Sequence, residues 1–128
     1  MKKTNNKKQA AFFAKLEFLM ALSDKAFENY LPAKFYLHAL CIRKNNKAVY
    51  RHIRENVTEI PDGLRDSFIQ LLNHYDIWLT QFENFRNSKA FALNDPFVFH
   101  HLDERSSYPK NAVAGIRAYA QKNTKEEG

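Results

Sequence analysis

Hydrophobic residues recur at helical spacing along most of the chain, and the longest such pattern covers residues 64–86. At 100° per residue, its large apolar side chains fall on one stripe about 140° wide. The members of the stripe are Leu64, Phe68, Leu71, Leu72, Tyr75, Trp78, Leu79, Phe82 and Phe85. Only Ile69 and Ile77 lie outside it. The pattern predicts a long amphipathic helix around which a bundle is organised.

Shorter patterns predict several helices before it. The expected ranges are 9–22, 25–30, 33–44 and 47–56. Ser23–Asp24 fits the N-cap of the second, Pro32 fits the start of the third, and Asn45–Asn46 is expected to end it. The first helix is apolar on two sides, which favours either a central place in the bundle or a side left for a partner.

After the long helix, residues 87–95 are expected to form a loop. Asp95–Pro96 then predicts a short helix over 96–104, and Pro109 opens a last one to about Lys122. Residues 1–8 are expected to be a flexible basic arm and residues 123–128 a polar tail. The sequence therefore predicts an all-α domain over 9–122, with five to six helices packed around 64–86.

Composition supports this class. The chain has 128 residues, of which 45% are hydrophobic and 27% charged, as expected for one globular domain. Three Gly and four Pro are too few for the many tight turns of an all-β domain of this length.

The single cysteine and the N-terminal region bear on the compartment. Cys41 lies within the apolar run 35–42 and is expected to be a small buried hydrophobe in a reducing environment. Lys15 and Glu17 interrupt the apolar stretch 10–22, which favours a helix of the mature protein over a signal peptide. No run is long enough to span a membrane, so we expect a cytoplasmic protein without a membrane partner.

Charge is distributed unevenly along the chain. Residues 1–54 contain 12 Lys or Arg against three acids, and residues 55–128 contain eight against 11. The two parts thus carry net charges of +9 and −3. Such a step indicates that the N-terminal half meets an acidic partner, with nucleic acid as the first choice.

Residues 43–54 hold the densest group of bases. The candidate nucleic-acid contacts there are Arg43, Lys44, Asn45, Asn46, Lys47, Arg51 and Arg54. Lys and Arg contact phosphates, and Asn and Arg can also read base edges. The stretch 45–54 (NNKAVYRHIR) resembles the recognition helix of helix-turn-helix proteins, and this resemblance implies DNA binding. The match is incomplete, because that motif usually has a Gly and then an apolar residue at the positions that Arg43 and Lys44 occupy here. The alternative is a solvated basic face without a ligand.

Two apolar regions are candidate partner surfaces. One is the second apolar side of the first helix, with Ala11, Phe18 and Leu22. The other consists of Phe91, Phe97, Phe99 and Tyr108, which either form an exposed patch or cap one end of the bundle.

Histidines and carboxylates offer a weak metal-binding hypothesis. The candidate ligands are His74, His100, His101 and Asp103. The last three share one short segment, but there is no HExxH spacing and no cysteine pair. Local salt bridges are therefore the better interpretation of these residues. We expect no metal or cofactor.

The sequence specifies no activity. We expect a non-enzymatic helical binding protein, with nucleic acid as its partner through residues 43–54. The alternative is a protein-interaction module, meaning an inhibitor, immunity or accessory protein or a homodimer, and a metal-dependent hydrolase ranks third.

Overall fold

The computed structural model describes residues 2–98 and 108–127. Most of this part consists of four helices: α1 (Lys2–Tyr30), α2 (Tyr36–Glu55), α3 (Arg65–Arg86) and α4 (Lys110–Glu127). Two 3-10 turns, η1 (Val57–Glu59) and η2 (Asp62–Leu64), join α2 to α3. The described residues contain no β-strand and only an isolated β-bridge. The all-α prediction is therefore confirmed, with four helices in this part instead of five or six.

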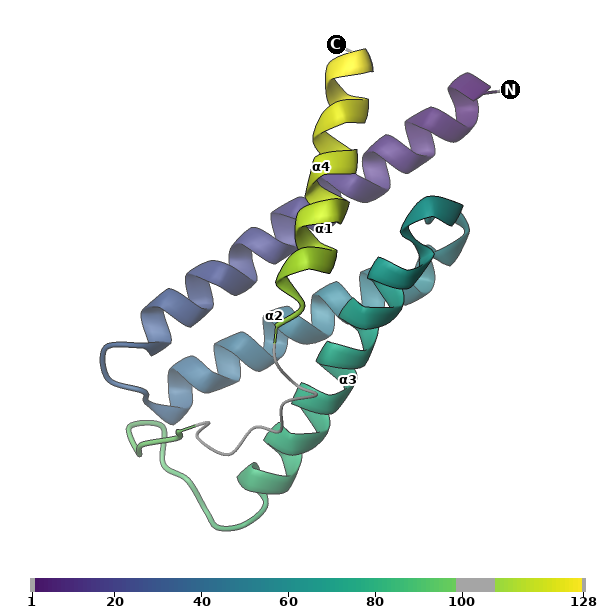
Figure 1. The fold of residues 1–128 in the computed structure, drawn as a ribbon. Coiled ribbons are helices and arrows are strands. Elements are labelled where there is room, and N and C mark those ends of the chain that lie inside the picture. The colour runs from purple at the N-terminus through teal and green to yellow at the C-terminus, as the bar shows by residue number, and fades with distance from the viewer. Residues whose placement is uncertain (1, 99–107, 128) are drawn as a thin grey trace.

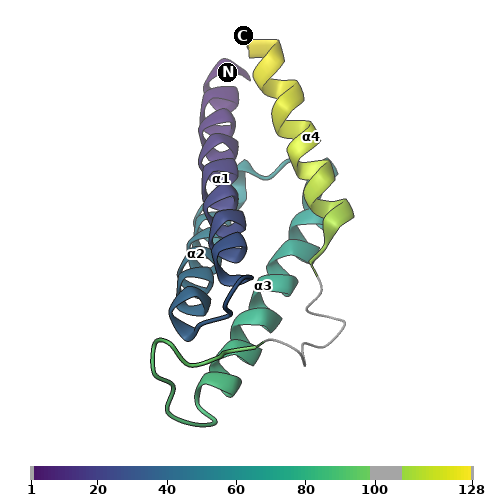
Figure 2. The ribbon, with the colours of Figure 1, turned by 90° about the vertical axis from the view of Figure 1, so that its left-hand side faces the viewer.

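The helices form two packed pairs. α1 and α2 run antiparallel along most of their length, and α3 and α4 pack against them (Figure 1). Figure 2 shows α1 and α2 on one side of the molecule and α4 on the other, above the N-terminal part of α3. The outer side of the α1–α2 pair is thus left open to solvent.

The core has two clusters. One joins all four helices through Phe12, Phe13, Leu16, Met20, Val49, Ile53, Phe68, Leu71, Tyr75, Val113 and Ile116. The other comprises Ala26, Tyr30, Tyr36, Ala39, Ile42, Trp78, Phe82 and Phe97. α1, α2 and α3 each contribute to both clusters, so the packing does not confirm the expected organisation of the bundle around the 64–86 helix.

α1 is one continuous helix of 29 residues, and the break expected at Ser23–Asp24 is absent. The Ser23 hydroxyl donates a hydrogen bond of 2.6 Å to the side-chain oxygen of Asn46 on α2 instead of capping a new helix. At the other end, residues 2–8, expected to be a flexible arm, are helical. The 9–22 and 25–30 patterns therefore belong to one element.

α2 is also continuous, over 20 residues, and the expected break at Asn45–Asn46 is wrong. The helix begins at Tyr36 rather than near Pro32, because residues 31–34 form the connection from α1. Lys34 has a φ of 53°, which lets the chain reverse direction there. Since α2 continues through residues 43–47 without a turn, the helix-turn-helix expectation is also wrong.

The long amphipathic pattern and the last helix are confirmed as elements. α3 covers Arg65–Arg86, within one residue of the expected range, and Phe68, Leu71, Tyr75, Trp78 and Phe82 are buried. Ile69, which breaks the stripe in the sequence, is exposed. α4 begins one residue after Pro109 and continues to Glu127, beyond the expected end at Lys122.

The loop after α3 folds back against the start of α2. Phe35 and Pro96 form the isolated bridge, and the Phe97 amide donates to the Lys34 carbonyl at 2.8 Å. The Tyr30 hydroxyl donates to the Phe97 carbonyl, and the Phe97 side chain is fully buried. The short helix expected over 96–104 is therefore wrong at residues 96–98, and the rest of that range lies outside the described residues.

Two further expectations concern single features. Cys41 is exposed, not buried, because it lies on the outer side of α2. None of the described helices has both the length and the apolar character needed to span a membrane.

Candidate nucleic-acid interface

The outer face of α2 carries a stripe of cations. Lys44, Lys47, Arg51 and Arg54 are all exposed, and at 100° per residue they fall within about 80° of one another. Across the described part of the chain, none of the four has a carboxylate within salt-bridge distance. We call these four residues the cationic stripe.

Three other residues of the expected contact set serve the fold instead. Arg43 pairs with Glu83 of α3, and its guanidinium lies 5.9 Å from the centre of the Phe82 ring. Asn46 is buried against Ser23, and the Asn45 side chain donates to the Leu22 carbonyl at 3.3 Å. These side chains connect α2 to its neighbours, so the stripe lacks the amides that were expected to read bases.

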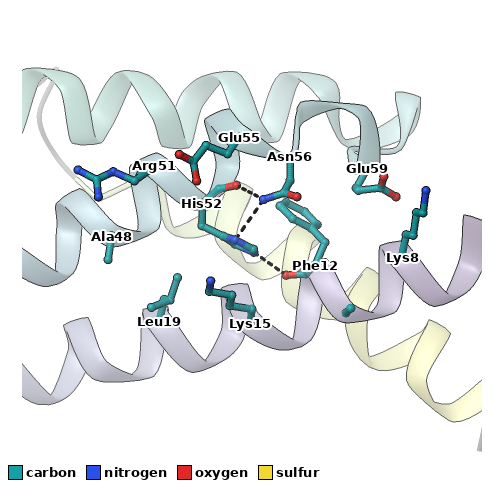
Figure 3. A pocket seen from close by; sticks show the side chains of 11 residues that line it. Lys8, Phe12, Lys15, Leu19, Ala48, Arg51, His52, Glu55, Asn56 and Glu59 are labelled. Carbon is teal, nitrogen blue, oxygen red and sulfur yellow. Dashed lines mark hydrogen bonds between the residues drawn. The ribbon is translucent and has the colours of Figure 1, made fainter.

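A groove of about 600 Å³ lies between α1 and α2, and Arg51 is the member of the stripe that lines it (Figure 3). Its lining side chains are Lys8, Ala11, Phe12, Lys15, Leu19, Ala48, Arg51, His52, Glu55, Asn56 and Glu59. Lys8 and Lys15 line the α1 side of the groove, whereas the opposite side carries Glu55 and Glu59 together with Arg51. The sequence alone does not indicate these two lysines, because only the α1–α2 packing brings them to the groove that Arg51 also lines.

His52, which lines this groove, connects α2 to α1. Its Nε2 lies 2.9 Å from the Phe12 carbonyl oxygen, and the Asn56 amide nitrogen lies 3.3 Å from its Nδ1 (Figure 3). A carbonyl only accepts, so Nε2 donates to Phe12, and the Asn56 amide nitrogen also donates to the His52 carbonyl at 2.8 Å. The ring also stacks on that of Phe12, at 4.9 Å between centroids. His52 therefore joins α1 to α2 and is not a free imidazole.

A second hollow, of about 430 Å³, lies on the other side of the stripe, toward α3. Its lining consists of Lys47, Tyr50, Arg51, Arg54, Glu55 and Leu79. The Arg54 guanidinium lies 5.5 Å from the centre of the Tyr50 ring, within the range of a cation–π contact. Tyr50 is half-buried and packs against the core with its other side. Arg51 and Glu55 thus line both hollows, whereas Lys47 and Arg54 line only the one toward α3.

The expected partner surface on α1 is exposed. Phe18 is 62% exposed and Leu22 is 40% exposed, and Ala11 is exposed as well. With Lys15 these side chains fall within about 60° on α1. This outward strip borders the α1–α2 groove, which Ala11 and Lys15 also line.

The other expected partner surface does not form in the described residues. Phe97 is fully buried and Phe91 is half-buried, and both rings pack together with Tyr36. These two residues therefore cap an end of the bundle. Tyr108 is 39% exposed, and Phe99 lies outside the described residues.

His74 is buried and packs edge-on against the rings of Tyr75 and Tyr108. Among the described residues, no three His, Cys, Asp or Glu side chains come together as a set of metal ligands. His100, His101 and Asp103 lie outside those residues. The metal hypothesis thus has no support from the described geometry.

A polar cluster joins α4 to α1 on the side away from the stripe. Arg117 donates to Glu17 at 3.2 Å and to Asp24 at 3.3 Å. Burial raises the pKa of Tyr75 in the same region, and the neighbouring Tyr108 and Asp24 raise it further, whereas Arg117 lowers it. Because these residues lie far apart in sequence, nothing in the local pattern indicated that they would meet.

Comparison of the chain with protein-family models, with curated proteins and with solved structures found no match.

Proposed function

We propose that this protein binds nucleic acid through the cationic stripe of α2. One observation carries the proposal: Lys44, Lys47, Arg51 and Arg54 share one exposed helix face and have no carboxylate partner in the described part of the chain. Unpaired cations spaced along a helix are suited to a polymer of phosphates, because each contact releases condensed counterions.

The surroundings of the stripe support a polymeric ligand rather than a small anion. The four residues cover three turns of α2, about 15 Å at 1.5 Å per residue, which is the length of several phosphates. Lys8 and Lys15 add cations across the groove. Contacts of this kind position a backbone without specifying its sequence.

The test is the binding of a fluorescently labelled 20-nucleotide RNA or DNA, measured by anisotropy at 50 mM salt. The variant Arg51→Glu/Arg54→Glu should lose binding at least tenfold, since it reverses half of the stripe. The matched control is Lys110→Glu/Lys122→Glu on α4, which makes the same change in net charge at exposed positions away from α2.

We expect the control to retain binding within about twofold to threefold, and circular dichroism to show all variants folded. An absence of wild-type binding to both RNA and DNA would rule the proposal out. An equal loss in both double variants would show that net charge, and not the stripe, attracts the ligand.

A protein-interaction role is the second candidate, and the exposure of Phe18 and Leu22 on α1 favours it. A second copy of the chain is the first occupant to test, because two apolar strips of this kind are self-complementary. Sedimentation at micromolar concentration should then give a dimer that Phe18→Ser converts to a monomer. A monomer at all concentrations argues against the homodimer.

A further inference from the structure

The hollow between α2 and α3 combines an aromatic surface with three cations. Tyr50 and Leu79 supply its apolar part, and Lys47, Arg51 and Arg54 surround them. Its volume of about 430 Å³ is in the range of small-ligand sites. The three cations belong to the cationic stripe, so a strand bound to the stripe passes the opening of this hollow.

The Tyr50 ring already makes a cation–π contact with a planar group. The Arg54 guanidinium lies over it, 5.5 Å from the ring centre. A nucleobase is also planar and has a π-face, and stacking on an aromatic side chain contributes strongly to single-strand binding whatever the base. Arg54 can either pair with a phosphate when a base takes its place or cover the base from the other side.

The position of the ring discriminates between single and double strands. Tyr50 is half-buried in a hollow, so only a base that has left its own stack can reach it. The outward face of α2 also lacks the amides that a helix uses in a major groove, because Asn46 is buried and Asn45 is bonded to Leu22. The arrangement suits unpaired nucleotides better than a duplex.

We infer that this hollow is a nucleobase subsite, in which an unstacked base lies on Tyr50 while Lys47, Arg51 and Arg54 hold the flanking phosphates. The inference rests on the proposed nucleic-acid binding and assigns its class of ligand, single-stranded RNA or DNA. Glu55, also at this hollow, repels the backbone and confines it to the cationic side.

The experiment compares a 12-nucleotide strand with a duplex of the same sequence in anisotropy titrations. Wild type should bind the single strand at least tenfold more tightly. Tyr50→Leu should weaken single-strand binding about 10- to 100-fold and change duplex binding less than twofold, and Tyr50→Phe should retain both affinities. The matched control is Tyr119→Leu, which removes another half-buried tyrosine, one that packs on Phe13.

A crosslinking measurement on the wild type covers the case in which Tyr50→Leu does not fold. A strand containing 5-iodouracil, irradiated in the complex, should attach to the tryptic peptide of residues 48–51, which contains Tyr50. Attachment only to other peptides would overturn the subsite.

The outcomes separate the two proposals. Failure of wild type to bind either nucleic acid removes the proposed function and the subsite together. Equal affinity for single strand and duplex, or a single-strand preference that Tyr50→Leu leaves intact, removes the subsite and leaves the proposed function standing.

Discussion

The salt dependence of binding is the sharpest test of which cations meet the ligand. Replacing Arg51 and Arg54 with Gln removes two members of the cationic stripe without adding negative charge. Arg43 lies next to the stripe on the same helix but pairs with Glu83. Replacing Arg43 with Gln therefore removes a charge that is already neutralised, and it serves as the matched control.

The stripe fixes the expected magnitude. Each phosphate neutralised on a single strand contributes about −0.7 to the slope of log K against log salt, so four contacts give a slope of about −3. Between 50 and 200 mM salt, affinity should then fall about 50-fold. With two contacts left, the slope should be about −1.4 and the loss about sevenfold. Contacts by Lys8 and Lys15 would make both slopes steeper by the same amount.

The assay is a set of anisotropy titrations at four salt concentrations for wild type, Arg51→Gln/Arg54→Gln and Arg43→Gln. We expect the double variant to reduce the slope by about 1.4 and Arg43→Gln to leave it unchanged. A wild-type slope shallower than about −1 would refute the assumption that all four residues of the stripe contact phosphates. If Arg43→Gln reduces the slope as much as the double variant does, Arg43 contacts the ligand despite its ion pair with Glu83.

The helix contacts and the groove allow four further predictions. His52→Ala removes a hydrogen bond and a stacked, buried ring, and should lower the free energy of unfolding by about 3 kcal/mol in urea denaturation; an unchanged midpoint would contradict its role between α1 and α2. Gly115→Ala should raise the melting temperature, because the new Cβ meets only the Ser67 hydroxyl, at 3.9 Å, and alanine is favoured in a helix by about 0.5–1 kcal/mol; a lower melting temperature would mean that the site is more crowded. Tyr75 holds its proton more tightly when folded, so wild-type stability should be fully present below the ordinary tyrosine pKa of 10.0 and fall as pH rises above it; Tyr75→Phe should make this fall less steep in denaturation curves between pH 8 and 11, and parallel curves would argue against the buried phenol. Glu55→Gln should tighten single-strand binding about twofold to fivefold at 50 mM salt by removing a carboxylate beside the stripe; weaker binding would indicate that Glu55 contacts the ligand through a hydrogen bond.

The sequence predicted the two helices, α3 and α4, whose signals are local to the segment itself. α3 carries a stripe that repeats over six turns, and its bounds agree within a residue. α4 has few apolar positions, yet Pro109 marks its start because proline fits the first turn of a helix. Both signals are local, so they can be interpreted without the rest of the fold.

The expected breaks at Ser23–Asp24 and Asn45–Asn46 failed for one shared reason. Serine and asparagine favour caps and turns because their side chains compete for the local backbone. Here Ser23 and Asn46 bond to each other across the α1–α2 interface, and Asn45 reaches the Leu22 carbonyl. Their polar groups are satisfied by the neighbouring helix, so both helices continue. Such partners lie more than 20 residues away and cannot be inferred from local pattern.

The candidate site was predicted in outline and not in detail. The density of bases over 43–54 indicated the segment, but spacing alone does not separate Arg43, which pairs with Glu83, from Arg51, which has no such partner among the described residues. Lys15 and Tyr50 became part of the site only through helix packing. The two-sided apolar pattern of the first helix left open whether its second side is buried or faces outward, and only the packing shows that Phe18 is exposed.

On α1, acidic and basic side chains lie on different sides of the helix. The N-terminal half has only three acids, and two of them, Glu17 and Asp24, pair with Arg117 of α4. These carboxylates therefore lie on the α4 side of α1, whereas Lys8 and Lys15 lie on the α2 side and line the groove. The acids that could have neutralised the outer face of the α1–α2 pair are thus held by a cation from the other half of the chain. The cations of this face outnumber Glu55 and Glu59, which also line the groove, and a surface with excess positive charge attracts a polyanion over distance.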